Sequence, residues 1–121
     1  AINPEMARAQ VEGGAIMGMS WAVLENLYPN YPDPKHQPRD FSQYTLTTAM
    51  DIPELTTEMV ECPSTDGPFG AKGIGEMTAN PPGPAVVSAV HDAIGVWITD
   101  IPITPEKVLR ALEKKEKADA V

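Results

Sequence analysis

The sequence predicts a small α+β domain in which helices pack on short strands. Helix signals occur at three places along the chain, and segments rich in β-branched and aromatic residues lie between them. The chain has 121 residues, a length that suits one domain because most domains run to about 100–150 residues. Helix and strand signals that alternate within one domain are typical of a mixed architecture.

The first helix is predicted to begin after Asn3. Asn is a favoured N-cap, Pro4 suits the first helical position, and Glu5 lies at the positive end of the helix dipole. Three glycines inside this helix each cost up to about 1 kcal/mol relative to Ala, so we expect another backbone or a ligand to approach it closely. These glycines are Gly13, Gly14 and Gly18.

The middle of the chain is predicted to be extended. Residues 28–39 contain four prolines, which exclude helix and interior strand and favour a surface loop. Segments Tyr44–Thr48 and Leu55–Cys62 have the residue types of short strands, and Val96–Thr99 is a third strand candidate.

Two further helices are predicted after a glycine-rich loop at Ser64–Glu76. The first begins near Pro84 and stops at Gly95, because Gly is favoured just after a helix end. The last begins after Thr104, which suits the N-cap, with Pro105 at the first helical position.

The charge balance excludes several classes of partner. Lys+Arg 9 against Asp+Glu 17 gives 9 − 17 = −8, which argues against nucleic acid, since binding to phosphates needs Lys and Arg. The longest weakly polar run, residues 13–24, is shorter than the ~20 residues of a membrane span. Cys62 is the only cysteine, so no internal disulfide can form and we expect a cytoplasmic protein.

The segment GPFGAKGIGE, Gly67 to Glu76, is the strongest local motif. Its four glycines leave backbone N–H groups uncovered, as in loops that bind an anion or a cofactor. It is not a P-loop, because Lys72 precedes glycine rather than Ser or Thr. Glu76 is the last residue of the motif, and the glycines before it place few side chains around its carboxylate. Such positioning suits a general base. An ordinary surface turn with a solvated carboxylate is the alternative.

This segment resembles the G-x-x-G-x-K-G-x-G-E signature near the C-terminus of the molybdenum-binding subunit in the xanthine dehydrogenase and aldehyde oxidase family. The resemblance extends over residues 1–112, which it identifies as the C-terminal part of a larger molybdopterin-binding domain, and it leaves residues 113–121 as a solvated tail. Other motifs occur in the family's order: INP at Ile2–Pro4, QVEGG at Gln10–Gly14, DIP at Asp51–Pro53 and DIPITPEKVLRAL at Asp100–Leu112.

The resemblance implies a role for particular residues. Glu76 corresponds to the family's active-site glutamate, the general base that removes a proton as oxygen is transferred to the substrate carbon. Gln10 corresponds to the glutamine that hydrogen-bonds the pterin, although a helix-surface glutamine is the alternative. Gly73 and Gly75 are expected to lend backbone N–H groups to the cofactor. The metal is held by the cofactor's dithiolene, so no protein metal ligand is expected. The supporting residues are Lys72, Gly13 and Gly14.

The resemblance also implies that this chain is incomplete as an enzyme, because the family's subunit is several times longer. We expect a split subunit or a fragment that shares molybdopterin with a partner chain, in a hetero-oligomer whose iron–sulfur clusters, and FAD if present, lie on other subunits. The assembled oxidoreductase would oxidise an aldehyde or N-heterocycle with water-derived oxygen. Met77 and Thr78 follow Glu76 where xanthine-type enzymes have Pro-Pro, which weakens the case for a purine. The nucleotide form of the cofactor, cytosine dinucleotide or another, stays open. The alternative is a noncatalytic remnant or an acidic interaction subunit.

Overall fold

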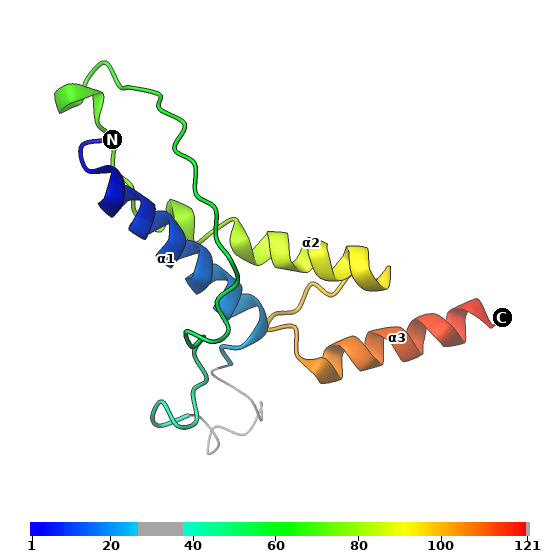
Figure 1. The fold of residues 1–121 in the computed structure, drawn as a ribbon. Coiled ribbons are helices and arrows are strands. Elements are labelled where there is room, and N and C mark those ends of the chain that lie inside the picture. Colours follow the sequence, from blue (N-terminus) through cyan, green and yellow to red (C-terminus); the bar gives the residue numbers. More distant parts are fainter. Residues whose placement is uncertain (27–37, 121) are drawn as a thin grey trace.

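The computed structural model describes residues 1–26 and 38–120, so most of the proline-rich segment 28–39 lies outside the described residues. Figure 1 shows α1 at one side of the molecule, with an extended segment running along it and with α2 and α3 projecting away. The elements in chain order are α1 (Pro4–Val23), η2 (Pro68–Gly70), η3 (Glu76–Thr78), α2 (Pro82–Ile94) and α3 (Pro105–Asp119).

Helix α1 begins where its capping residues predict. The Asn3 side-chain oxygen accepts a hydrogen bond from the Met6 N–H at 3.1 Å, and Pro4 occupies the first position. The helix ends at Val23, after which the Leu24 N–H still bonds the Ser20 carbonyl at 2.8 Å. The predicted first helix is therefore confirmed.

The predicted α+β class is wrong, because the described parts of the chain contain helices and no strand. Segments Tyr44–Thr48, Leu55–Cys62 and Val96–Thr99 are bends or extended chain. Residues 52–62 run beside α1 (Figure 1), yet none of their backbone groups bonds another backbone group in the described structure. Their β-branched residues favour a pleated surface, but a strand also needs a neighbour about 4.8 Å away to bond, and these segments lack one.

The predicted caps at Gly95 and Thr104 are present, although α2 begins at Pro82 rather than near Pro84. Helix α2 ends at Ile94, and its C-cap Gly95 adopts a left-handed φ of 69° and donates its N–H to the His91 carbonyl at 2.7 Å. The Thr104 hydroxyl caps α3 by accepting from the Lys107 N–H at 3.4 Å. Glu106, in the first turn, has its pKa held below the ordinary value by its own backbone N–H and then by the Thr104 hydroxyl.

The link before α3 is held by the Lys107 side chain and by one backbone hydrogen bond to α1. The Lys107 ammonium donates to the carbonyls of Asp100 at 3.0 Å and Pro102 at 2.9 Å, and it pairs with the Asp100 carboxylate at 2.8 Å. The Ile103 N–H donates to the Ala22 carbonyl near the end of α1 at 2.7 Å. The helix itself continues to Asp119 with exposed side chains over its last turns.

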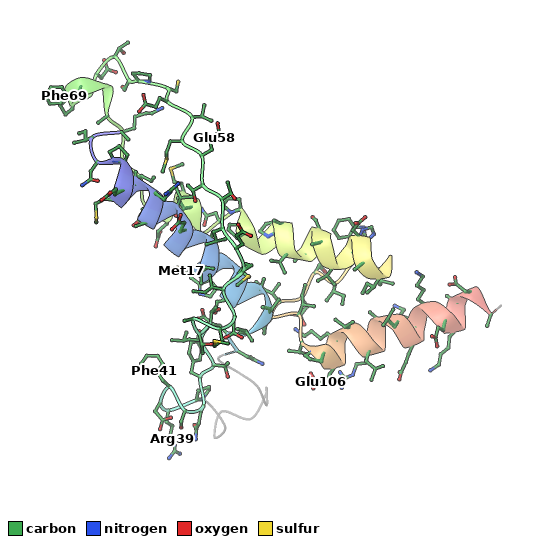
Figure 2. The ribbon with its side chains drawn as sticks, viewed as in Figure 1. Met17, Arg39, Phe41, Glu58, Phe69 and Glu106 are labelled. Carbon is green, nitrogen blue, oxygen red and sulfur yellow. The ribbon has the colours of Figure 1, made fainter. Side chains whose placement is uncertain are left out.

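The hydrophobic core is small and lies where α1 meets η3, α2 and the link to α3. Among the described residues its buried hydrophobic members are Ala22, Ala79, Ile98 and Ile103. Figure 2 shows Phe69 at the far end of the glycine-rich loop, where it is 98% exposed. The chain exposes 9407 Å², against about 6,300 Å² for a compact protein of its 13.0 kDa mass.

Candidate functional site

Two glycines on one face of α1 accept the segment that follows Glu76. A β-carbon at Gly14 would lie 1.9 Å from the Thr78 hydroxyl oxygen, and one at Gly18 would lie 2.3 Å from the Ala79 carbonyl oxygen. Positions four apart are neighbours on a helix surface, so the two glycines form one notch. The close approach expected at Gly14 and Gly18 is present, and the neighbour is backbone and a short side chain of η3.

The Thr78 hydroxyl fixes this contact with hydrogen bonds. Its single O–H is shared between two acceptors, the Gln10 carbonyl of α1 and the Gly75 carbonyl, with both oxygens at 3.2 Å. Thr78 is only 9% exposed, so the hydroxyl exchanges water for these two acceptors. The loop before Glu76 is thereby joined to the first half of α1.

The side chain of Gln10 reaches the same carbonyl. Its Nε2 donates to the Gly75 carbonyl at 3.3 Å, across 65 residues of sequence. Gly75 immediately precedes Glu76, which begins η3. The structure therefore brings the predicted cofactor glutamine and the backbone of the predicted base together. The Glu76 carboxylate itself is exposed and has no hydrogen bond or ion pair with any described residue.

An open glycine surface lies beside these residues. A β-carbon at Gly13, Gly73 or Gly75 would meet nothing of this chain within 4 Å. Gly13 is three residues from Gln10 and so shares its side of α1. The backbone of α1 and of the loop can thus be approached closely from outside at these positions.

Comparisons with known proteins agree on one family. A family model described as a molybdopterin cofactor-binding domain matches residues 1–53. The chain is 39% identical over 116 residues to the probable hypoxanthine oxidase XdhD of Escherichia coli K12, covering 93% of this chain and 12% of that protein. It is 36% identical over 122 residues to the gamma subunit of the 6-hydroxypseudooxynicotine dehydrogenase complex of Paenarthrobacter nicotinovorans, covering 98% of this chain and 15% of that protein. The chain belongs to the xanthine dehydrogenase and aldehyde oxidase family.

A solved structure in this family has the same architecture. The chain matches quinoline 2-oxidoreductase from Pseudomonas putida 86 with a TM-score of 0.84 and 30% identity, over 94% of this chain and 15% of that one. The chain thus spans between 12% and 15% of the length of these relatives. The open arrangement of α1, α2 and α3 is therefore shared with a segment of a much longer family member.

Lys72, predicted as a supporting residue, has no partner among the described residues. Lys72 is exposed and makes no hydrogen bond or ion pair with a described residue, so its supporting role stays a prediction.

Within residues 1–26 and 38–120, no three His, Cys, Asp or Glu side chains are grouped so that they could hold a metal ion. No helix in the described part of this family member is long and apolar enough to cross a membrane.

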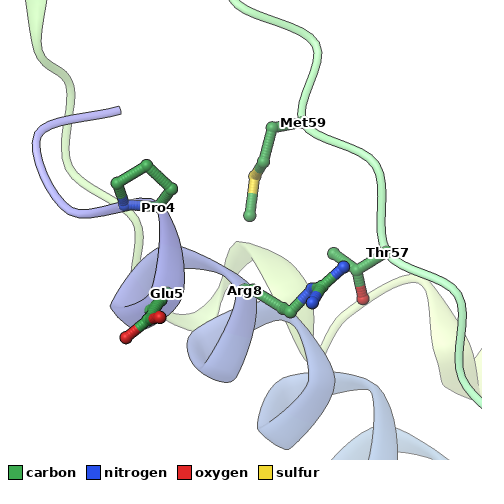
Figure 3. Close-up of a pocket in the computed structure, with 5 residues that line it drawn as sticks. All are labelled: Pro4, Glu5, Arg8, Thr57 and Met59. Atoms are coloured by element: carbon green, nitrogen blue, oxygen red, sulfur yellow. The ribbon is translucent and has the colours of Figure 1, made fainter.

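A shallow cavity of about 210 Å³ lies elsewhere, between the first turns of α1 and the extended segment. Figure 3 shows the Arg8 and Thr57 side chains facing each other across it. Its lining residues are Pro4, Glu5, Arg8, Thr57 and Met59. It includes none of the residues predicted from the family motif, and it is smaller than the about 300–1,000 Å³ of typical ligand pockets.

Sequence reasoning missed Thr78 as a site residue. The sequence showed only that Met77 and Thr78 follow Glu76 in place of the Pro-Pro of xanthine-type enzymes. The role of the hydroxyl depends on Gln10 and Gly14, more than sixty residues earlier. No spacing or propensity rule links a single threonine to a helix so distant in sequence.

Proposed function

We propose that this chain supplies the general base and one side of the cofactor pocket of a molybdenum hydroxylase. The observation that carries the proposal is the hydrogen bond from Gln10 Nε2 to the Gly75 carbonyl at 3.3 Å. It joins the two motifs of the family resemblance directly beside Glu76. The reaction would be oxidation of an aldehyde or N-heterocycle with oxygen from water.

The residues present fit molybdopterin on the open glycine surface. Gly73 and Gly75 leave the loop backbone accessible, and an accessible backbone N–H is a donor that suits a pterin ring or a phosphate. Gly13 allows close approach to α1, but its own N–H is bonded within the helix. Gln10, whose amide already lies at this surface, would complete the contact, and Lys72 would support the loop. When bound, the cofactor supplies the two-electron redox chemistry.

Glu76 would act as the base. Its carboxylate accepts a proton as the oxygen atom bonds to the substrate carbon, and a positioned general base typically contributes about 10²–10⁴-fold to the rate. The side chain is exposed on this chain, so other parts of the enzyme would have to exclude water around it. Its backbone is already held against α1 through Thr78.

The rest of the site would come from outside these residues. The chain spans between 12% and 15% of its relatives, so we infer that the cofactor is shared with further subunit segments or a partner chain. Iron–sulfur clusters, and FAD if present, would lie on other subunits. A cytosine dinucleotide form of the cofactor and a cytoplasmic location remain predictions.

The test is Glu76→Gln in the assembled enzyme that contains this chain. We expect molybdenum content to stay at the wild-type level while turnover of an aldehyde or N-heterocycle falls at least about 100-fold, since glutamine cannot accept the proton. Glu113→Gln, which changes an exposed carboxylate on α3, is the matched control and should retain full turnover. Unchanged turnover in Glu76→Gln overturns the base assignment. A wild-type assembly without molybdenum would favour the noncatalytic alternative.

A further inference from the structure

We propose that Thr78 is a positioning residue that sets the direction of the Glu76 carboxylate. It does so by holding the peptide before Glu76 against α1. The inference rests on the proposed role of Glu76 and assigns a function to a residue outside the family motif.

The first step is the seat of Thr78 on α1. Its side chain fills the space that a β-carbon at Gly14 would occupy, at 1.9 Å from the hydroxyl oxygen and 2.6 Å from the Thr78 β-carbon. Position 14 must therefore be glycine for Thr78 to approach this closely. From this seat the hydroxyl reaches the Gln10 carbonyl at 3.2 Å, one turn earlier on the helix.

The second step is the control of the peptide that joins Gly75 to Glu76. The Gly75 carbonyl accepts from the Thr78 hydroxyl at 3.2 Å and from Gln10 Nε2 at 3.3 Å. In a planar trans peptide the carbonyl and the following N–H point in opposite directions. Two donors on the carbonyl therefore fix the Glu76 N–H to point away from them.

The third step is the other side of Glu76. Its own carbonyl accepts from the Ala79 N–H at 2.9 Å, and the Ala79 carbonyl lies in the notch at Gly18. The peptides before and after Glu76 are thus both anchored through residues 78 and 79. Only the side chain of Glu76 keeps rotational freedom, and its starting direction is set by the anchored backbone.

The test uses Thr78→Val and Thr78→Ser in the assembled enzyme. Valine keeps the shape of threonine and removes the hydroxyl, whereas serine keeps the hydroxyl. Because a misplacement of about 1 Å can lower a rate by about 10²-fold, we expect kcat of Thr78→Val to fall by about 10- to 100-fold. KM and molybdenum content should stay near wild type, and Thr78→Ser should recover most of kcat.

A second readout is independent of turnover. Amide hydrogen exchange across residues 75–79 should speed up in Thr78→Val and return toward wild type in Thr78→Ser, while exchange in α2 stays unchanged. Thr65→Val is the matched control, because Thr65 lies in the glycine-rich loop before η3 and is exposed. Among the described residues its side chain bonds only Asp66, at 3.4 Å. This variant should change neither kcat nor exchange at residues 75–79.

Three results would overturn the proposal: wild-type kcat in Thr78→Val, unaltered exchange at residues 75–79, or no recovery in Thr78→Ser. Wild-type kcat in Thr78→Val together with loss of turnover in Glu76→Gln removes the positioning role and leaves the proposed function intact. Normal turnover in both Thr78→Val and Glu76→Gln would overturn the positioning role and the proposed function together. If Thr78→Val speeds up amide exchange at residues 75–79 but keeps wild-type kcat, the Thr78 contact is structural only, and this result also overturns the proposal.

Discussion

Gly13 and Gly14 are adjacent in α1 and have opposite surroundings. A β-carbon at Gly14 would collide with Thr78, whereas one at Gly13 would meet nothing of this chain within 4 Å. Successive residues on a helix are rotated by about 100° around its axis, so one residue faces η3 and the other faces the open glycine surface. The same substitution at these two positions therefore tests two different contacts.

We expect Gly14→Ala to lower the thermal midpoint of the assembled enzyme, because overpacking costs about 1–3 kcal/mol. Gly13→Ala should leave the midpoint unchanged or raise it slightly, since alanine is favoured in helices by about 1 kcal/mol. The same variant should reduce molybdenum content, because its methyl group would project onto the open glycine surface, where the cofactor is proposed to bind. Thermal melting and metal analysis check both.

Gly83→Ala is the matched control for this pair. A β-carbon there comes no closer than 3.9 Å to its nearest neighbour, the Gly18 carbonyl. The midpoint should therefore stay unchanged or rise slightly, as in Gly13→Ala, and metal content should not change. A fall in midpoint in Gly13→Ala as large as in Gly14→Ala would contradict the assignment of the two faces.

At the residue scale, the sequence predicted which residues belong to the candidate site better than it predicted the contacts between them. The motif resemblance singled out Gln10, Gly75 and Glu76, and the structure joins the first two by a hydrogen bond. It did not predict which of Gly13 and Gly14 contacts η3, because that depends on the segment that packs against α1. It also could not reveal Thr78, whose acceptors lie on a distant helix.

At the element scale, helix ends were predictable and strands were not. The caps of α1 and α3 depend on residues within one turn, such as Asn3 bonding Met6 and Thr104 bonding Lys107. A strand depends on a neighbour that can be remote in sequence, and Leu55–Cys62 has none in the described structure. The helices were therefore predictable from residues within one turn. The α+β class was wrong because strands depend on pairing with segments remote in sequence.

Helix α3 offers a test of capping at this scale. Thr104→Ala removes the hydroxyl that accepts from the Lys107 N–H, and loss of such an N-cap typically costs about 1 kcal/mol. We expect faster amide exchange in the first turn of α3 and unchanged exchange in α1. Thr104→Ser, which keeps the acceptor, should behave as wild type. Equal exchange in the alanine and serine variants would contradict the cap.

At the scale of the whole molecule, the chain exposes more surface than its mass predicts. Its 9407 Å² exceeds the about 6,300 Å² of a compact protein of this size by roughly half. Large apolar side chains such as Met6, Val60 and Phe69 are among the exposed ones. Burial of apolar surface is the main favourable contribution to folding, so the isolated chain should be only weakly stable.

We therefore expect the isolated 121-residue chain to bind the dye ANS and to unfold over a broad range of urea concentration. In the proposed assembly the same residues should be protected from amide exchange, because neighbouring segments would cover the apolar surface. Fluorescence and urea titration of the isolated chain check the first expectation. A sharp cooperative transition without dye binding would contradict it.

Segment 52–62, whose backbone is unpaired in the described structure, has a consequence for the chain before assembly. Extended backbone with free N–H and C=O groups is a template for self-association, and natural proteins oppose this with charge and proline. This segment carries Glu54, Glu58 and Glu61, and Pro53 and Pro63 lie at its two ends. Because residues 52–62 carry three carboxylates and no Lys or Arg, like charges would oppose the pairing of two copies along this segment. We therefore expect the carboxylates of this segment to oppose self-association of the isolated chain.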